Sequence, residues 1–119
     1  MTGEGRVPKD ARDADKDAEY TLIFGLGPTN DGTPNTDVDL AIALAALEDQ
    51  SLKTCGGFTI HRGKGGWIDP EGKTIKEEVA ILMISGSYAR VVEIAAIGKA
   101  MLGRTAIYVK KPDGSTILL

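Results

Sequence analysis

The feature that most constrains the fold is a pair of strand-like segments, residues 58–62 and 79–84, which flank a long insert, residues 63–78. The insert contains the single tryptophan, Trp67, together with four glycines, three lysines and a turn built on residues 69–72. It is too long for a tight hairpin loop, which spans two to five residues. The insert therefore fixes the middle of the fold and is the first candidate for a binding surface.

Strand patterns occur on both sides of this central pair. Residues 20–26 alternate with a period of two, so that four apolar side chains share one face of a first strand. Residues 79–84 are apolar on both faces, which is typical of a central strand. Residues 105–110 form a fourth strand, and a turn at residues 111–114 predicts a fifth strand over residues 115–119.

Two helices are predicted between these strands. Thr36 is a candidate N-cap, with Asp37 and Asp39 in the first turn, for a helix over residues 38–50. Ser87 is the candidate cap of a helix over residues 88–102, and Gly103 suits its C-terminal end. Gly98 lies inside this helix, where glycine costs about 1 kcal/mol relative to alanine. Close approach to a strand or to another subunit would justify it.

The resulting order is β-α-β, insert, β-α-β and a terminal hairpin, which is the ferredoxin-like order of the α+β class. We predict an antiparallel sheet with two helices on one face, over a domain that spans residues 19–119. An uncovered apolar face predicts a homo-oligomer, either a dimer or a trimer. Residues 1–18 are polar and charged, which predicts a disordered tail or a short helix that docks on a partner.

Composition excludes several classes of protein. The net charge of −3 argues against a nucleic-acid-binding protein that acts through its overall charge. The single cysteine, Cys55, excludes an internal disulfide. No apolar run approaches the length of about 20 residues that a membrane span needs, and the N-terminus has no apolar signal region. We expect a cytoplasmic protein without a cofactor.

The insert offers a candidate site for an anionic ligand. Glycines allow backbone N–H groups to approach a phosphate, and Arg62 and Lys64 add positive charge. Trp67 could stack on a base, or it could pack in the core or at a subunit interface. The alternative for the whole segment is a flexible hairpin arm with solvated lysines. The predicted ligand-binding residues are Arg62, Gly63, Lys64, Gly65, Gly66, Trp67, His61 and Glu77.

Evidence for catalysis or metal binding is weak. His61 is the only histidine, and a lone histidine on a strand is usually structural or solvent-facing. Glu77 and Glu78 lie at the start of the third strand, where one could pair with Arg62 or Lys64 or hold a ribose hydroxyl, or simply mark the strand start. Cys55 has no base beside it in sequence. We therefore predict neither catalytic residues nor metal ligands.

Several short stretches resemble a family of small bacterial proteins that is described only as a domain of unknown function. The resemblance rests on Phe24-Gly25-Leu26, on residues 57–60, and on residues 66–77 with their Gly-Trp, Asp-Pro-Glu-Gly and Glu elements. It implies a ferredoxin-like fold and no catalytic activity. The order of elements is also similar to that of the PII-like signalling proteins, trimers that bind nucleotides between subunits.

Three functions remain open at this point. The first is a homo-oligomeric protein that binds a small anionic ligand, with a nucleotide among the candidates, as a sensor or by sequestering it. The second is a small ferredoxin-like enzyme that uses His61 or a carboxylate as acid or base. The third is a structural or protein-interaction subunit. We predict the first, because glycines, basic residues and one tryptophan gather in the insert.

Overall fold

The computed structural model describes residues 16–119, so that most of the predicted tail, residues 1–18, lies outside the described residues. The elements follow the predicted order: β1 (Ala18–Gly25), α2 (Asp37–Cys55), β2 (Thr59–Ile68), β3 (Thr74–Gly86), α3 (Tyr88–Leu102), β4 (Tyr108–Lys110) and β5 (Thr116–Leu118). The predicted α+β, ferredoxin-like arrangement with a C-terminal hairpin is confirmed. No helix in residues 16–119 has the length and apolar character that crossing a membrane requires.

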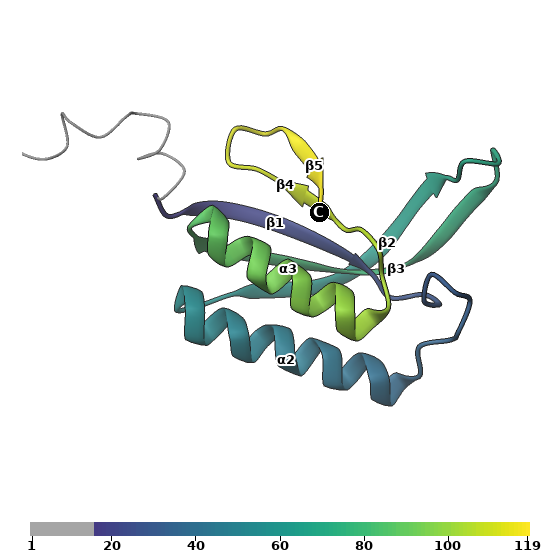
Figure 1. Cartoon of the computed structure of the whole chain (residues 1–119), viewed down its shortest axis with the longest axis horizontal. Helices are drawn as coiled ribbons and strands as arrows, with labels where there is room; N and C mark the ends of the chain where they lie inside the picture. The colour runs from purple at the N-terminus through teal and green to yellow at the C-terminus, as the bar shows by residue number, and fades with distance from the viewer. Residues whose placement is uncertain (1–15) are drawn as a thin grey trace, which may run out of the picture.

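The five strands form one antiparallel sheet in the order β2-β3-β1-β4-β5. Both helices lie against the same face of this sheet (Figure 1). The register places Leu22 of β1 opposite Leu82 of β3 and Val109 of β4, and all three side chains are fully buried. Residues 79–84, which are apolar on both faces, belong to β3, and β3 is an inner strand, as this pattern predicts.

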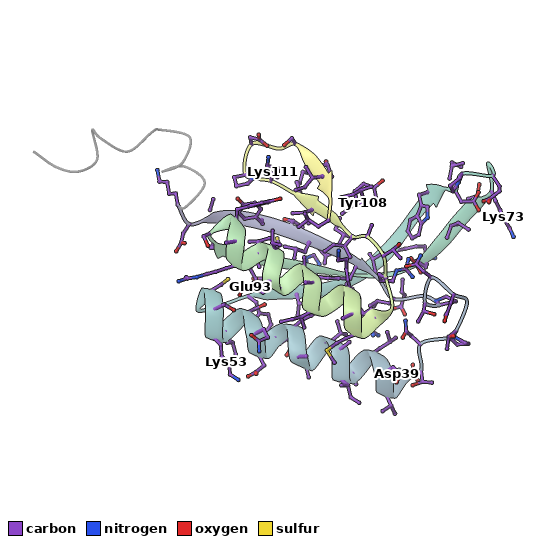
Figure 2. All side chains as sticks on the ribbon, in the orientation of Figure 1. Asp39, Lys53, Lys73, Glu93, Tyr108 and Lys111 are labelled. Atoms are coloured by element: carbon purple, nitrogen blue, oxygen red, sulfur yellow. The ribbon has the colours of Figure 1, made fainter. Side chains whose placement is uncertain are left out.

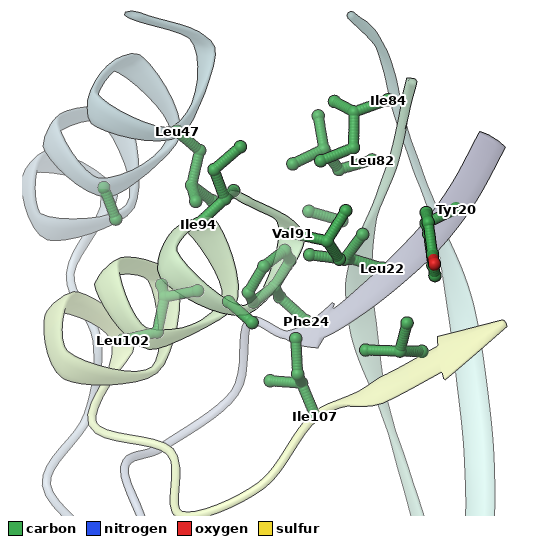
Figure 3. Packing of buried hydrophobic residues seen from close by; sticks show 14 of the residues in the cluster. Tyr20, Leu22, Phe24, Leu47, Leu82, Ile84, Val91, Ile94, Leu102 and Ile107 are labelled. Carbon is green, nitrogen blue, oxygen red and sulfur yellow. The ribbon is translucent and has the colours of Figure 1, made fainter. Parts of the chain in front are cut away.

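The hydrophobic core lies between this sheet face and the two helices (Figure 3). Phe24 of β1 lies at its centre, close to Gly98 of α3. A Cβ atom on Gly98 would stand 2.9 Å from both Cδ1 and Cζ of the Phe24 ring. The close approach to a strand that Gly98 predicts is therefore confirmed.

The helix ends follow the predicted capping residues. Thr36 and Asp39 form a reciprocal capping box, with each side chain accepting a bond of 3.1 Å from the other residue's backbone N–H. Ser87 caps α3, and Gly103 ends it with φ +64°. The predicted end of α2 at residue 50 is wrong, because Gly56, with φ +80°, ends the helix only after Cys55.

The insert is a continuation of the two strands that flank it. Pairing of β2 with β3 runs to the pair Ile68 and Thr74, so the loop itself is only residues 69–73. The Asp69 carboxylate closes that loop by accepting hydrogen bonds from the backbone N–H groups of Glu71 and Lys73. We call residues 63–78 the arm. It projects past the ends of the helices (Figure 1), with Lys73 at its tip (Figure 2).

The sheet face opposite the helices has no covering layer among residues 16–119 (Figure 1). We call it the open face. Ile23, Ile81 and Tyr108 lie side by side across it in the register of the three inner strands. Tyr108 is 50% exposed and Leu118, its partner on β5, is 61% exposed. The open face therefore presents apolar side chains to its surroundings.

Strand β4 is shorter than predicted. It covers three residues, Tyr108–Lys110, whereas residues 105–110 were expected. The backbone N–H of Thr105 donates to the Asn30 side chain at 2.6 Å. This bond joins the segment after α3 to the loop after β1, so Thr105 has a partner outside the sheet.

Candidate ligand-binding site

The predicted site residues divide between the two faces of β2, because side chains alternate along a strand. His61, Gly63, Gly65 and Trp67 belong to the open face, where they pair with Ile81, Val79, Glu77 and Ile75 of β3. Arg62, Lys64 and Gly66 belong to the other face, where they pair with Ala80, Glu78 and Lys76. The structure thus brings Trp67, His61 and Glu77 to one face and the two basic residues to the other.

Arg62 and Lys64 therefore lie on the opposite face of β2 from Trp67. Arg62 approaches Glu78 at 4.0 Å, and both side chains are about half exposed, so the pair contributes little to stability. Lys64 is exposed. The glycines at positions 63, 65 and 66 each have a pairing partner on β3, so the segment is a strand and not a loop.

Glu77 has a partner that the sequence did not indicate. Its Oε1 accepts a hydrogen bond from Nη2 of Arg104 at 3.1 Å, and its Oε2 accepts one from the Gly27 N–H at 2.9 Å. Nη1 of Arg104 donates to the Pro28 carbonyl at 2.7 Å. The side chains of Glu77 and Arg104 are only 9% and 14% exposed. This largely buried ion pair connects β3, the end of β1 and the segment after α3.

Two glycines make room for the pair. Gly25 pairs with Val79, which lies two residues after Glu77 in β3, and Gly27 lies two residues after the end of β1. A Cβ atom on Gly25 would collide with the Glu77 carboxylate and stand 2.9 Å from Nη2 of Arg104. A Cβ atom on Gly27 would collide with the same carboxylate. The absence of side chains at both positions lets the carboxylate lie against the backbone.

Further hydrogen bonds fix the segment that carries Arg104. Asn35 donates from Nδ2 to the Gly27 carbonyl at 2.9 Å and to the Leu102 carbonyl at 3.1 Å. The Asn30 N–H donates to the Gly103 carbonyl at 2.9 Å. The loop after β1 is thus tied to the end of α3, directly before Arg104.

A cavity of about 270 Å³ lies on the open face, between the arm and the β4–β5 hairpin. Trp67 and Tyr108 supply aromatic surface, and Arg104 is the one charged side chain among the described residues that line it. The remaining lining is mainly apolar, and the complete lining is Ile23, Gly25, Asn30, Trp67, Ile68, Val79, Arg104, Thr105, Ala106, Ile107, Tyr108 and Leu118. An apolar hollow with a few polar groups is typical of small-molecule sites.

His61 does not line this cavity, although it shares the open face. Within residues 16–119, no group of three or more His, Cys, Asp or Glu side chains could hold a metal ion. The arrangement suits noncovalent binding, with stacking on an aromatic ring and hydrogen bonds to a guanidinium group.

A second hollow, of about 310 Å³, lies where α2 leads into β2, and Cys55 and Met83 are in its lining. Burial raises the pKa of the Cys55 thiol, and the nearby Arg90 guanidinium opposes this effect. A thiol with a raised pKa is a poorer nucleophile at neutral pH. This hollow has neither the aromatic pair nor the fixed charge of the first cavity, which is why we take the first as the candidate site.

Arg104, Asn30 and Tyr108 are the site residues that sequence reasoning missed. Arg104 is far from Glu77 in sequence, and no local pattern links the two. One signal was available, namely two glycines spaced by one residue at the end of the first strand, Gly25 and Gly27. Such a pair indicates that another group approaches the backbone closely.

Comparison with known proteins places the fold among solved structures. No family model and no curated protein matches the chain. A phage SAM lyase in complex with S-methyl-5′-thioadenosine is similar over 87% of this chain and 88% of its own, with a TM-score of 0.63 and 11% identity. The apo form of a phage SAM lyase matches over 89% and 90%, with a TM-score of 0.54 and 13% identity.

A third similar structure is the periplasmic divalent cation tolerance protein CutA from Archaeoglobus fulgidus. It covers 85% of this chain and 81% of its own, with a TM-score of 0.51 and 13% identity. At these identities the likeness shows the fold, which agrees with the predicted ferredoxin-like class. The resemblance to the family of small bacterial proteins finds no matching family model.

Proposed function

We propose that the protein is a homo-oligomer that binds a small ligand of the nucleoside or nucleotide class in the cavity beside Trp67 and Arg104. It would act as a sensor or by sequestering the ligand. The observation that carries this proposal is the cavity itself, which joins aromatic surface to one fixed guanidinium group.

The chemistry of the lining favours a flat ligand with polar edges. Trp67 and Tyr108 offer aromatic rings, and stacking of a base on an aromatic side chain is worth about 1–3 kcal/mol. Arg104 and Asn30 add hydrogen-bonding groups to the lining of the cavity. A nucleoside satisfies both features, because its base is flat and its edges and ribose carry donors and acceptors.

The structural comparison supports the same class of ligand. A phage SAM lyase with a similar fold holds S-methyl-5′-thioadenosine, which is an adenine nucleoside. That likeness is one of fold at 11% identity. It supports the proposal because one protein with a similar fold binds a molecule of this class.

The oligomer is proposed from the open face. The helices cover one side of the sheet, and the other side carries half-exposed Tyr108 and Leu118. Within residues 16–119, the outer edges of β2 and β5 have no neighbouring strand. A second copy of the chain would pair with an edge and cover the apolar face, so that the cavity would become a cleft between two subunits. Sedimentation equilibrium tests this, because a monomer at working concentrations would contradict it.

The other two functions of the sequence analysis are less well supported. The enzyme would need His61 near the ligand, and His61 lies outside the lining of the cavity. An interaction subunit would use the charged tail, residues 1–18, and the arm as contacts, and it would need no ligand. A cytoplasmic location stays a prediction.

The binding experiment uses Trp67 as its reporter, because it is the only tryptophan in the chain. We would titrate the protein with adenosine, S-methyl-5′-thioadenosine and AMP while recording fluorescence and the melting temperature. A ligand at one hundred times its Kd stabilises the native state by about 2.7 kcal/mol. We expect a saturable fluorescence change and a raised midpoint with at least one of the three.

A pair of exposed leucines provides a matched comparison. Leu118, 61% exposed, lines the cavity, and Leu52, 54% exposed, lies on α2 on the helical side of the molecule. Leu118→Ala should weaken binding by about five- to tenfold through lost apolar contact, and Leu52→Ala should leave it unchanged. Absence of any response to the three compounds, or equal effects of the two variants, would contradict the proposal.

A further inference from the structure

The charge of the candidate site is balanced within the protein. Arg104 brings one positive charge to the cavity, and Glu77 holds the compensating negative charge at 3.1 Å behind it. Both side chains are largely buried, so water screens their interaction poorly. No other charged side chain of residues 16–119 is in the lining. A ligand that enters the cavity therefore meets a site with almost no net charge.

The geometry also leaves Arg104 able to donate to a ligand. A guanidinium group has five N–H donors in a fixed plane. Within residues 16–119 one bond goes to Glu77 Oε1 and one to the Pro28 carbonyl. The remaining donors of a group that lines the cavity are available to neutral acceptors such as ring nitrogens, hydroxyl groups or carbonyl oxygens.

The guanidinium group is also held in place. Its two bonded nitrogens connect to β3 through Glu77 and to the loop after β1 through Pro28. A phosphate oxygen could accept from one of the free N–H groups, but a bidentate contact with both terminal nitrogens would require the group to turn away from Glu77 and Pro28. That movement would leave the Glu77 carboxylate buried without its partner, which is strongly unfavourable.

From this arrangement we infer that the charge-balanced pair of Arg104 and Glu77 sets the specificity of the site, which selects an uncharged nucleoside over its phosphorylated form. Glu77 is a positioning residue, which holds Arg104 and cancels its charge. This inference rests on the proposed function, and it narrows the nucleoside or nucleotide class to the uncharged member. In this proposal Arg104 is the basic residue that contacts the ligand, in place of Arg62 and Lys64.

The test compares adenosine with AMP, which differ by one phosphate group, in three forms of the protein. In the wild type, adenosine should bind at least about tenfold more tightly than AMP. Glu77→Gln keeps an oxygen acceptor for the Gly27 N–H and removes the negative charge. In this variant the ratio of AMP affinity to adenosine affinity should rise by about tenfold.

The double variant Glu77→Gln with Arg104→Gln is the control, because it restores a balanced charge. It should return to the wild-type preference for adenosine over AMP, with weaker binding of both. This pattern separates an electrostatic role from a structural one, since a merely structural role of Glu77 would weaken both ligands equally.

A readout without nucleosides keeps the two proposals distinguishable. Inorganic phosphate, compared with chloride at equal ionic strength, should raise the melting temperature of Glu77→Gln more than that of the wild type or the double variant. If none of the nucleosides binds the wild type, the proposed function fails and the phosphate comparison still tests the charge balance. If adenosine binds and the AMP ratio is the same in all three forms, or if phosphate stabilises them equally, the inference is overturned.

Discussion

Replacing Gly98 by alanine tests how closely helix α3 packs on the sheet. In an exposed helix this change would stabilise the protein by about 1 kcal/mol. Here the new Cβ atom would stand 2.9 Å from two carbon atoms of the Phe24 ring, whereas carbon atoms in contact prefer about 3.5–4.0 Å. The ring is fully buried within the hydrophobic core.

Overpacking of a well-packed core costs about 1–3 kcal/mol. We take the upper end of that range, because several ring atoms are involved. After the gain in helix propensity, Gly98→Ala should lower the free energy of unfolding by about 2 kcal/mol. Urea denaturation measures this difference as a lower transition midpoint at an unchanged slope.

Two controls isolate the packing effect. Ala96→Gly, at an exposed position of the same helix, should cost about 1 kcal/mol and reports propensity alone. Phe24→Leu removes the obstructing ring, so the double variant with Gly98→Ala should be about 3 kcal/mol more stable than the sum of the single changes predicts, because the whole cost of the clash is lost. A Gly98→Ala protein as stable as the wild type, or strictly additive changes, would refute the reasoning.

Two other predictions concern the loop after β1 and the thiol at the end of α2. Gly27→Ala should lower the free energy of unfolding by about 3 kcal/mol, because its Cβ atom would separate Glu77 from Arg104. Urea denaturation measures this loss, and a loss below about 0.5 kcal/mol would contradict the prediction. The Cys55 pKa is raised by burial and opposed by Arg90, so alkylation should be slower than for a peptide thiol at neutral pH and speed up only toward higher pH. Arg90→Gln should slow the alkylation of Cys55 further, because the guanidinium group lowers the pKa of the thiol. An unchanged rate would show that Arg90 has no effect on this pKa.

Local signals were sufficient to predict most of the fold. Thr36, Ser87 and Gly103 cap helices as expected, because capping depends on a few neighbouring residues. The predicted bounds of α3, residues 88–102, agree with the structure. The apolar pattern of residues 79–84 correctly indicated an inner strand.

The arm was underestimated for a physical reason. Gly63, Gly65 and Gly66 have weak strand propensity, and their sequence suggested a loop. Their partners on β3 include Val79 and Glu77, which belong to a long strand whose other half is fixed in the core. Tertiary pairing therefore overrides the local preference of the glycines. The two strands extend to Ile68 and Thr74 as a result.

The candidate site was only partly predictable. Trp67 was chosen from its surroundings in sequence and does line the cavity, whereas Arg62 and Lys64 lie on the opposite face of β2. The period of two along a strand could have shown this separation. The pairing of Glu77 with Arg104 could not be found this way, because it depends on how α3 returns the chain to the end of β1.

The length of the arm can change without disturbing the ion pair. Glu77 lies at the base of the arm, far from its tip. Its position is fixed by the neighbouring part of β3, where Val79 pairs with Gly25 of β1. Residues could therefore be gained or lost around the turn at Asp69 while Glu77 stays beside Arg104. Changes in steps of two would keep each side chain of the two strands on its present face of the sheet. Among related sequences, such variation would change how far the arm extends and how much of the cavity it lines. The ion pair of Glu77 and Arg104 would keep its position.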